Sequence, residues 1–196
     1  TAIGDMVNAG VVITQEDADR LEKELELTEL EAPDGIPSVQ IYAQLLGLYL
    51  FKNDLCNAKF LWKRVPANLK TNLELKQVWL IGKALWEKDF KSVYELANVD
   101  WSDDMKSIIV GVIENVRNRV MCLVEKAYSS IELNEFSRLI GMPPKQAIEF
   151  TMSRNWKYED STGYLLPKEQ RIITSLSISS EDRLERLVDF VSFLEN

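Results

Sequence analysis

Hydrophobic residues recur along most of this chain at the spacing of an α-helix, and charged residues fill the positions between them. Residues 15–30 predict an amphipathic helix with three leucines near one side: Leu21, Leu25 and Leu30. Two prolines that flank a glycine then interrupt the pattern at residues 31–37. Residues 38–51 are apolar on nearly every side, which predicts a helix that is buried on most of its surface.

Residues 45–61 and residues 80–96 form an internal repeat. Apolar positions coincide, and so do two glycines and two aspartates: Gly47 with Gly82, and Asp54 with Asp89. Helix pairs repeated about every 34 residues are typical of tetratricopeptide proteins. We expect the glycines where helices approach closely, and the aspartates in the turn before the second helix of each pair. Two copies without the full consensus indicate a tetratricopeptide-like region over residues 15–127, an arrangement that usually presents interaction surfaces.

A long helix is predicted from Ser102 to Tyr128. Ser102 is suited to the N-cap, and the two aspartates that follow it lie in the first turn, where the helix dipole favours anions. Five branched side chains fall along one side of this helix: Ile108, Val112, Val116, Val120 and Val124.

Residues 128–168 have the pattern of a winged helix. A short amphipathic helix over residues 131–140 ends at Gly141, and a second helix begins near Pro144, so the two are joined by a tight turn. Two short segments rich in aromatic side chains then flank a DSTG turn, which predicts a β-hairpin: residues 156–159 and 164–167.

The two ends of the chain lie outside these units. We expect residues 1–14 to be disordered, and residues 169–179 to be a linker. A last helix over residues 180–196 carries an i, i+3, i+4, i+7 stripe: Leu184, Leu187, Val188, Val191 and Leu194. This stripe must be covered either by the chain's own core or by helices of partner chains, and the spacing does not choose between them. The predicted fold is mainly α (α+β).

The composition excludes most catalytic chemistry. The chain has no histidine, so it cannot form a Ser-His-Asp or Cys-His pair or a zinc-binding HExxH helix. It also lacks glycine-rich phosphate-binding motifs, and most carboxylates fall on polar helix faces. We therefore predict no catalytic residues, no cofactor and no metal. Cys56 and Cys122 lie in apolar helical patterns and are expected to be buried, reduced thiols. No apolar run approaches the ~20 residues of a membrane span, and we expect no signal peptide.

Charge argues against the DNA-binding role that many winged helices have. The chain has a net charge of −8, and residues 129–168 contain five basic and five acidic residues. Because binding to duplex DNA requires several cations against phosphates, a nucleic-acid binder is only the alternative hypothesis. The predicted wing is instead aromatic and apolar, which favours strand addition by another protein. The candidate partner residues of the wing are Trp156, Tyr158, Tyr164, Leu165 and Leu166, unless they fold back onto the core.

Helical hairpins that run into a winged helix resemble the PCI-domain family, which is named after the proteasome lid, the COP-nine signalosome and a translation initiation factor. The stretches ELEAPDGI, YAQLLGLYLFKNDLCNAKFLWKRVPANLK, AYSSIELNEFSRLIGM and LVDFVSFLEN are similar to the smallest PCI subunits, and above all to those of the signalosome. The small subunits of the proteasome lid and of initiation factor three match these stretches less well.

This resemblance implies a non-catalytic scaffold subunit. PCI subunits associate edge to edge through their winged helices, and their C-terminal helices gather in one bundle. The signalosome removes a ubiquitin-like modifier from cullins and thereby regulates cullin-RING ubiquitin ligases, through a separate metalloprotease subunit. The implied partners are other PCI subunits and the C-terminal helices of the complex, with no nucleic acid and no membrane, in cytoplasm and nucleus. A carboxylate enzyme without histidine is the remaining, third hypothesis.

Overall fold

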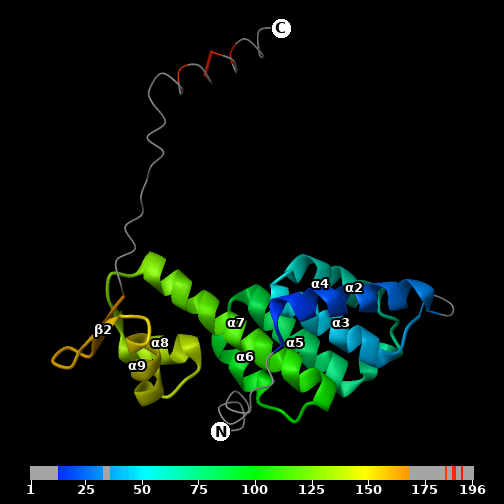
Figure 1. Cartoon of the computed structure of the whole chain (residues 1–196), viewed down its shortest axis with the longest axis horizontal. Coiled ribbons are helices and arrows are strands. Elements are labelled where there is room, and N and C mark those ends of the chain that lie inside the picture. The colour runs from blue at the N-terminus through cyan, green and yellow to red at the C-terminus, as the bar shows by residue number, and fades with distance from the viewer. Residues whose placement is uncertain (1–12, 33–35, 168–183, 185–186, 189–190, 192–196) are drawn as a thin grey trace.

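The computed structural model describes residues 13–32, 36–167, 184, 187–188 and 191. As predicted, these residues are mainly helical, with one small sheet (Figure 1). The elements are α2 (Gln15–Glu31), α3 (Val39–Lys52), α4 (Leu55–Arg64), η2 (Leu69–Thr71), α5 (Leu73–Glu87), α6 (Phe90–Ala97), α7 (Asp103–Ala127), β1 (Ile131–Glu132), α8 (Leu133–Ile140), α9 (Pro144–Met152), β2 (Lys157–Glu159) and β3 (Tyr164–Leu166).

Each copy of the internal repeat forms a pair of antiparallel helices, α3 with α4 and α5 with α6. The aspartates lie where the sequence placed them, as N-caps of the second helices. The side chain of Asp54 accepts a hydrogen bond from the amide of Asn57 at 3.0 Å, and that of Asp89 accepts one from the amide of Ser92 at 3.3 Å. Each aspartate follows a left-handed residue, Asn53 or Lys88, so the two turns match in backbone geometry.

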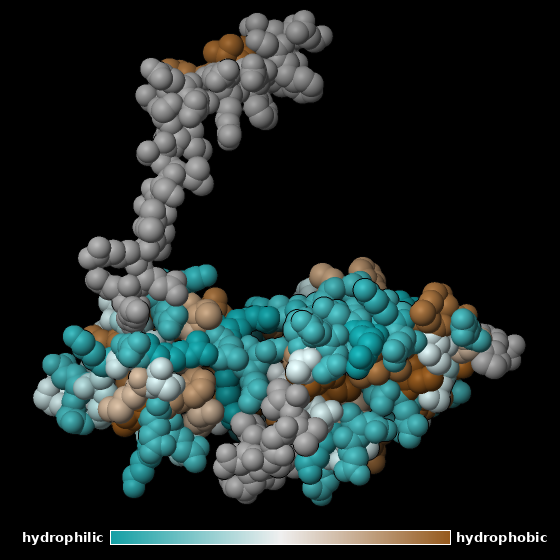
Figure 2. Space-filling view, in the orientation of Figure 1, coloured by the Kyte–Doolittle hydropathy of each residue, from teal (hydrophilic) through white to brown (hydrophobic). Residues whose placement is uncertain are grey.

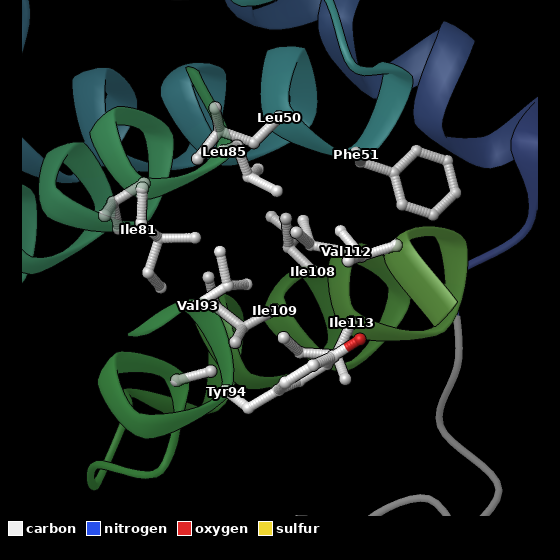
Figure 3. Close-up of a cluster of buried hydrophobic side chains, with 14 of the residues drawn as sticks. Leu50, Phe51, Ile81, Leu85, Val93, Tyr94, Ile108, Ile109, Val112 and Ile113 are labelled. Atoms are coloured by element: carbon white, nitrogen blue, oxygen red, sulfur yellow. The ribbon is translucent and has the colours of Figure 1, made fainter. Parts of the chain in front are cut away.

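A large part of the core, shown in Figure 3, lies between α3, α5, α6 and α7. Helix α3 is buried on nearly every side, as its apolar sequence predicted, and α7 packs along it. Gly47 permits this contact, because a Cβ atom at that position would lie 2.9 Å from Cγ2 of Ile108. Gly82 has the same role between α5 and α3, where a Cβ atom would lie 3.1 Å from Cδ2 of Leu50. All five branched residues of the predicted α7 stripe are buried.

Hydrophilic residues cover much of the visible surface of α2 and α4 (Figure 2). The guanidinium of Arg64 donates hydrogen bonds to both carboxylate oxygens of Glu29, at 2.8 and 2.7 Å. Lys52 forms ion pairs with Asp19 and Glu22. These pairs tie α2 to α3 and α4, although pairs this close to solvent contribute little each.

Two expectations for this region, the place of Leu30 and the burial of the cysteines, are wrong. Leu30 is 81% exposed, because it lies about 140° around the helix from the buried Leu25. Cys56 and Cys122 are exposed, since both lie on the outer sides of their helices. Of the segment expected to be disordered, residues 1–12 lie outside the described residues, and the Thr14 side chain caps α2 by accepting from the amide of Asp17.

The C-terminal part is described at four positions. Leu184, Leu187, Val188 and Val191 are helical, and each is at least half exposed. Leu194 and the predicted linker over residues 169–179 lie outside the described residues. Within the described residues, no helix combines the length and the apolar character that a membrane crossing requires.

Candidate functional site

The helix-turn-helix has the geometry that the sequence predicted. Gly141 ends α8 in the left-handed conformation, with φ of 64°, and its amide donates to the carbonyl of Ser137 at 3.0 Å. Pro144 is the first residue of α9. A Cβ atom on Gly141 would lie 2.3 Å from the ring of Tyr94, so only glycine fits here. The predicted first helix is shorter than expected, because Ile131 and Glu132 form a strand.

That strand changes the predicted wing. The sequence predicted a two-stranded hairpin, whereas the sheet has the order β1-β3-β2. Ile131 pairs with Leu165, so β3 is the central strand. A two-residue strand carries no periodic signal, which is why sequence reasoning placed these residues in a helix. Among the described strands, β1 and β2 are therefore both edge strands, and β2, with three residues, is the longer of the two.

Two of the predicted wing contacts are core residues. Trp156 is 4% exposed, its ring lies 5.3 Å from that of Phe136, and its indole nitrogen donates to Glu125 at 3.0 Å. Leu165 is fully buried. The prediction that a partner contacts the side chains of Trp156 and Leu165 is therefore wrong. A Trp156→Glu substitution would therefore place a charge in the core rather than test an interface.

Strand alternation explains which wing residues stay accessible. Residues paired across antiparallel strands share one face of the sheet. Tyr158 is paired with Leu165 and packs partly against the core, so it is also a poor partner contact. Tyr164 and Leu166 point to the opposite face, where they are 42% and 37% exposed. The accessible wing surface therefore consists of Tyr164, Leu166 and the outer edge of β2.

A buried polar joint, which sequence reasoning missed, fixes the winged helix on the repeats. The hydroxyl of Tyr94 donates to the carbonyl of Leu139 at 3.1 Å, and Nε of Arg117 donates to that of Ile140 at 3.2 Å. These are carbonyls of the last turn of α8, which have no partner within the helix. Burial raises the pKa of Tyr94 and lowers the pKa of Arg117, and the two side chains lie together, with the guanidinium carbon 5.5 Å from the ring.

No sequence signal would have found this joint, because an arginine beside an apolar stripe is ordinary in an exposed helix. The joint fixes the orientation of the winged helix, and with it the sheet, relative to the helical repeats. It therefore determines where the edge of β2 points relative to the helical repeats.

The basic residues of the winged helix are partly engaged within the chain. Arg138 pairs with Glu135 at 2.7 Å, and Arg154 donates a hydrogen bond to the side-chain oxygen of Asn118. Lys145 and Glu149 are both exposed on α9. A helix with this mixed charge is poorly suited to the phosphate backbone of DNA. In the part of the chain that the structure describes, no three Cys, Asp or Glu residues gather as metal ligands would.

The chain is similar to known proteins over most of its length. A family model for the CSN8/PSMD8/EIF3K family matches residues 37–175. The COP9 signalosome complex subunit 8 of Xenopus laevis is 38% identical over 179 residues, which cover 90% of this chain and 92% of the relative. The protein of the same name from Danio rerio is 36% identical over 180 residues, or 91% and 94% of the two chains.

More distant relatives agree with these. The COP9 signalosome complex subunit 8 of Arabidopsis thaliana is 30% identical over 154 residues, which cover 78% of this chain and 77% of the relative. The resemblance inferred from the sequence is thereby confirmed, and the chain belongs to the CSN8/PSMD8/EIF3K family.

Proposed function

We propose that this chain is a subunit of the COP9 signalosome and acts there as a non-catalytic scaffold. It would support the complex that removes a ubiquitin-like modifier from cullins and so regulates cullin-RING ubiquitin ligases, in cytoplasm and nucleus. The observation that carries the proposal is the identity of 30–38% with proteins of that name, over most of both chains. The proteasome lid and initiation factor three share the family name, but the relatives reported above are all signalosome subunits.

The sheet of the winged helix would form the first contact with a neighbouring subunit. The outer edge of β2 offers backbone groups to an added strand, because no described strand lies on that side. Tyr164 and Leu166 add exposed apolar area on the adjoining face. The joint made by Tyr94 and Arg117 supports this role, since an interface used in a large assembly must be held in a fixed direction.

The last helix would form the second contact, as a member of a bundle with helices of other subunits. Its four described apolar residues are 50–62% exposed: Leu184, Leu187, Val188 and Val191. An apolar stripe at helical spacing gains stability only when it is covered. In the described residues this chain does not cover it, which supports burial by partner chains, with Leu194 continuing the stripe.

The proposal is tested by assembly. We expect Tyr164→Asp and Leu166→Asp to fold normally and to weaken incorporation when co-expressed with the other signalosome subunits, as measured by native mass spectrometry. Removal of residues 180–196 should impair integration more strongly. Met152→Asp is a matched control, because Met152 is 56% exposed in the same module but lies on α9.

Two outcomes would contradict the proposal at different levels. Full incorporation of both wing variants and of the truncated chain would reject the interfaces. Purification of the native protein together with lid or initiation-factor subunits would reject the choice of complex. A nucleic-acid role would require a salt-dependent duplex titration with a steep slope, and we expect a slope near zero.

A further inference from the structure

A groove lies between α4 and α5, away from the winged helix in the chain and sharing no residue with the interfaces proposed above. It encloses about 450 Å³, enough for a large side chain. Its lining includes the small, buried residues Ala58 and Gly82, with Leu55, Trp79 and Trp86 beside them. Ala58 and Gly82 contribute little side-chain volume to the wall of the groove.

The groove is rich in tryptophan. Trp86 is 51% exposed, which is unusual for a side chain that is mostly buried in folded proteins. Trp79 stacks on Trp62, with ring centroids 4.9 Å apart and planes within 2° of parallel. Three of the five tryptophans of the chain are thus at or beside this groove. Exposed tryptophan is enriched among the residues that dominate protein–protein binding.

The groove lining carries two lysines, Lys59 and Lys83, and one carboxylate, Glu87, in a chain that is acidic as a whole. Residues 55–88 contain seven basic and two acidic residues, although the chain has a net charge of −8. The ammonium of Lys59 lies 4.9 Å from the centre of the Trp86 ring, and that of Lys70 lies 5.4 Å from the centre of the Trp62 ring. Lys83 lies at the rim and pairs with the exposed Glu87 at 3.7 Å.

We propose that this groove is a docking site for an acidic segment of another protein. The segment would insert one large apolar side chain beside Trp79 and Trp86, and its carboxylates would pair with Lys59 and Lys83. The charge of the groove favours an acidic partner, and its apolar lining requires a hydrophobic anchor. The observations favour a peptide over single-stranded nucleic acid, because Trp62 and Trp79 already use one face each for stacking and Lys59 covers a face of Trp86.

The proposal is tested with the full chain and fluorescein-labelled peptides of about twelve residues, in which Asp and Glu flank a central Phe. Fluorescence anisotropy should show binding that weakens as salt is added. We expect Trp86→Ala and Lys59→Glu each to weaken it roughly tenfold. Both residues are exposed, so these variants should fold, and circular dichroism melts verify that they do.

Lys91→Glu is the matched control. Lys91 pairs with Glu95 at 3.6 Å in the same i, i+4 arrangement as Lys83 with Glu87, but on α6 outside the groove. Unchanged binding to this variant, with loss in Lys83→Glu, would support the site. Equal binding of a peptide with central Ser would overturn the apolar anchor. No saturable binding of the Phe peptide, or tighter binding of a uridine oligonucleotide that the groove variants abolish, would overturn the proposal.

Discussion

Corresponding side chains of the two helical repeats can differ widely in burial. Phe51, near the end of α3, is 5% exposed, whereas Trp86, at the corresponding position of α5, is 51% exposed. The first repeat is covered by α2 on one side and by α7 along α3. Gly111 of α7 makes room for the Phe51 ring, since a Cβ atom there would lie 2.8 Å from it. No described helix gives the α4–α5 groove such a cover, so Trp86 remains open to a partner.

A sequence repeat thus specifies the local backbone geometry, whereas the burial of each repeated position depends on the rest of the fold. Matching positions have the same backbone geometry, as Asn53 and Lys88 show with φ of 60° and 62°. Their burial depends on which neighbour happens to pack there. At this pair of matching positions, Phe51 therefore contributes to stability, whereas Trp86 is accessible to a partner.

The largest expected difference is between Phe51→Ala and Trp86→Ala. The first substitution should lower the free energy of unfolding by about 3–5 kcal/mol, because it leaves a cavity against α7. The second should cost about 1 kcal/mol or less, because half of the side chain is already in water. Urea unfolding of both variants measures the difference, and equal losses would show that both positions are core.

The glycines provide the next contrast. Gly47→Ala should cost about 1–3 kcal/mol, because the added methyl would press on branched Ile108 at 2.9 Å and on Met105 at 3.2 Å. Gly82→Ala should be close to neutral. Its methyl would meet a terminal methyl of the Leu50 side chain, at 3.1 Å, and alanine gains up to about 1 kcal/mol of helix propensity. Thermal melts of the two variants would contradict this prediction if the order were reversed.

Tyr94 in the second repeat corresponds to Lys59 in the first, and only Tyr94 is buried. Tyr94→Phe should cost about 1 kcal/mol at neutral pH, through the lost hydrogen bond to Leu139. Burial raises the pKa of Tyr94. Its contribution to the free energy of unfolding is therefore complete below the ordinary tyrosine pKa and is lost as pH rises above that value. Denaturant titrations at neutral and alkaline pH should therefore show a smaller alkaline loss in the variant than in the parent chain.

The aspartate caps should give the smallest and most equal effects. Asp54→Ala and Asp89→Ala each remove one cap, and we expect similar small decreases in melting temperature. The hydroxyl and amide of Ser92 lower the pKa of Asp89. Its charge therefore stabilises the fold above the ordinary aspartate pKa, and this contribution is lost as pH falls through the lower, folded value. Asp89→Asn should keep the cap and reduce the acid sensitivity, which melts between neutral and acidic pH would measure.

Sequence reasoning identified the helices, the repeat and the turn at Gly141, because caps, glycine conformations and helical periods are local properties. It also recognised the family from stretches such as the one over residues 42–70. It could not find the third strand, since Ile131 and Glu132 are too few to show a period. For the same reason it could not tell which face of the wing was accessible, and it assigned Trp156 and Leu165 to a partner instead of the core.

The sequence by itself determined the helical content, the turns and the absence of histidine chemistry, because these follow from short-range spacing and composition. Tertiary structure alone decided that Phe51 is core and Trp86 surface, that Tyr94 and Arg117 hold the winged helix, and that β3 is the central strand of the sheet. The physical reason is that burial depends on contacts between residues far apart in the chain. The pattern of side chains indicates which face of a helix or strand is apolar, whereas packing determines what covers that face.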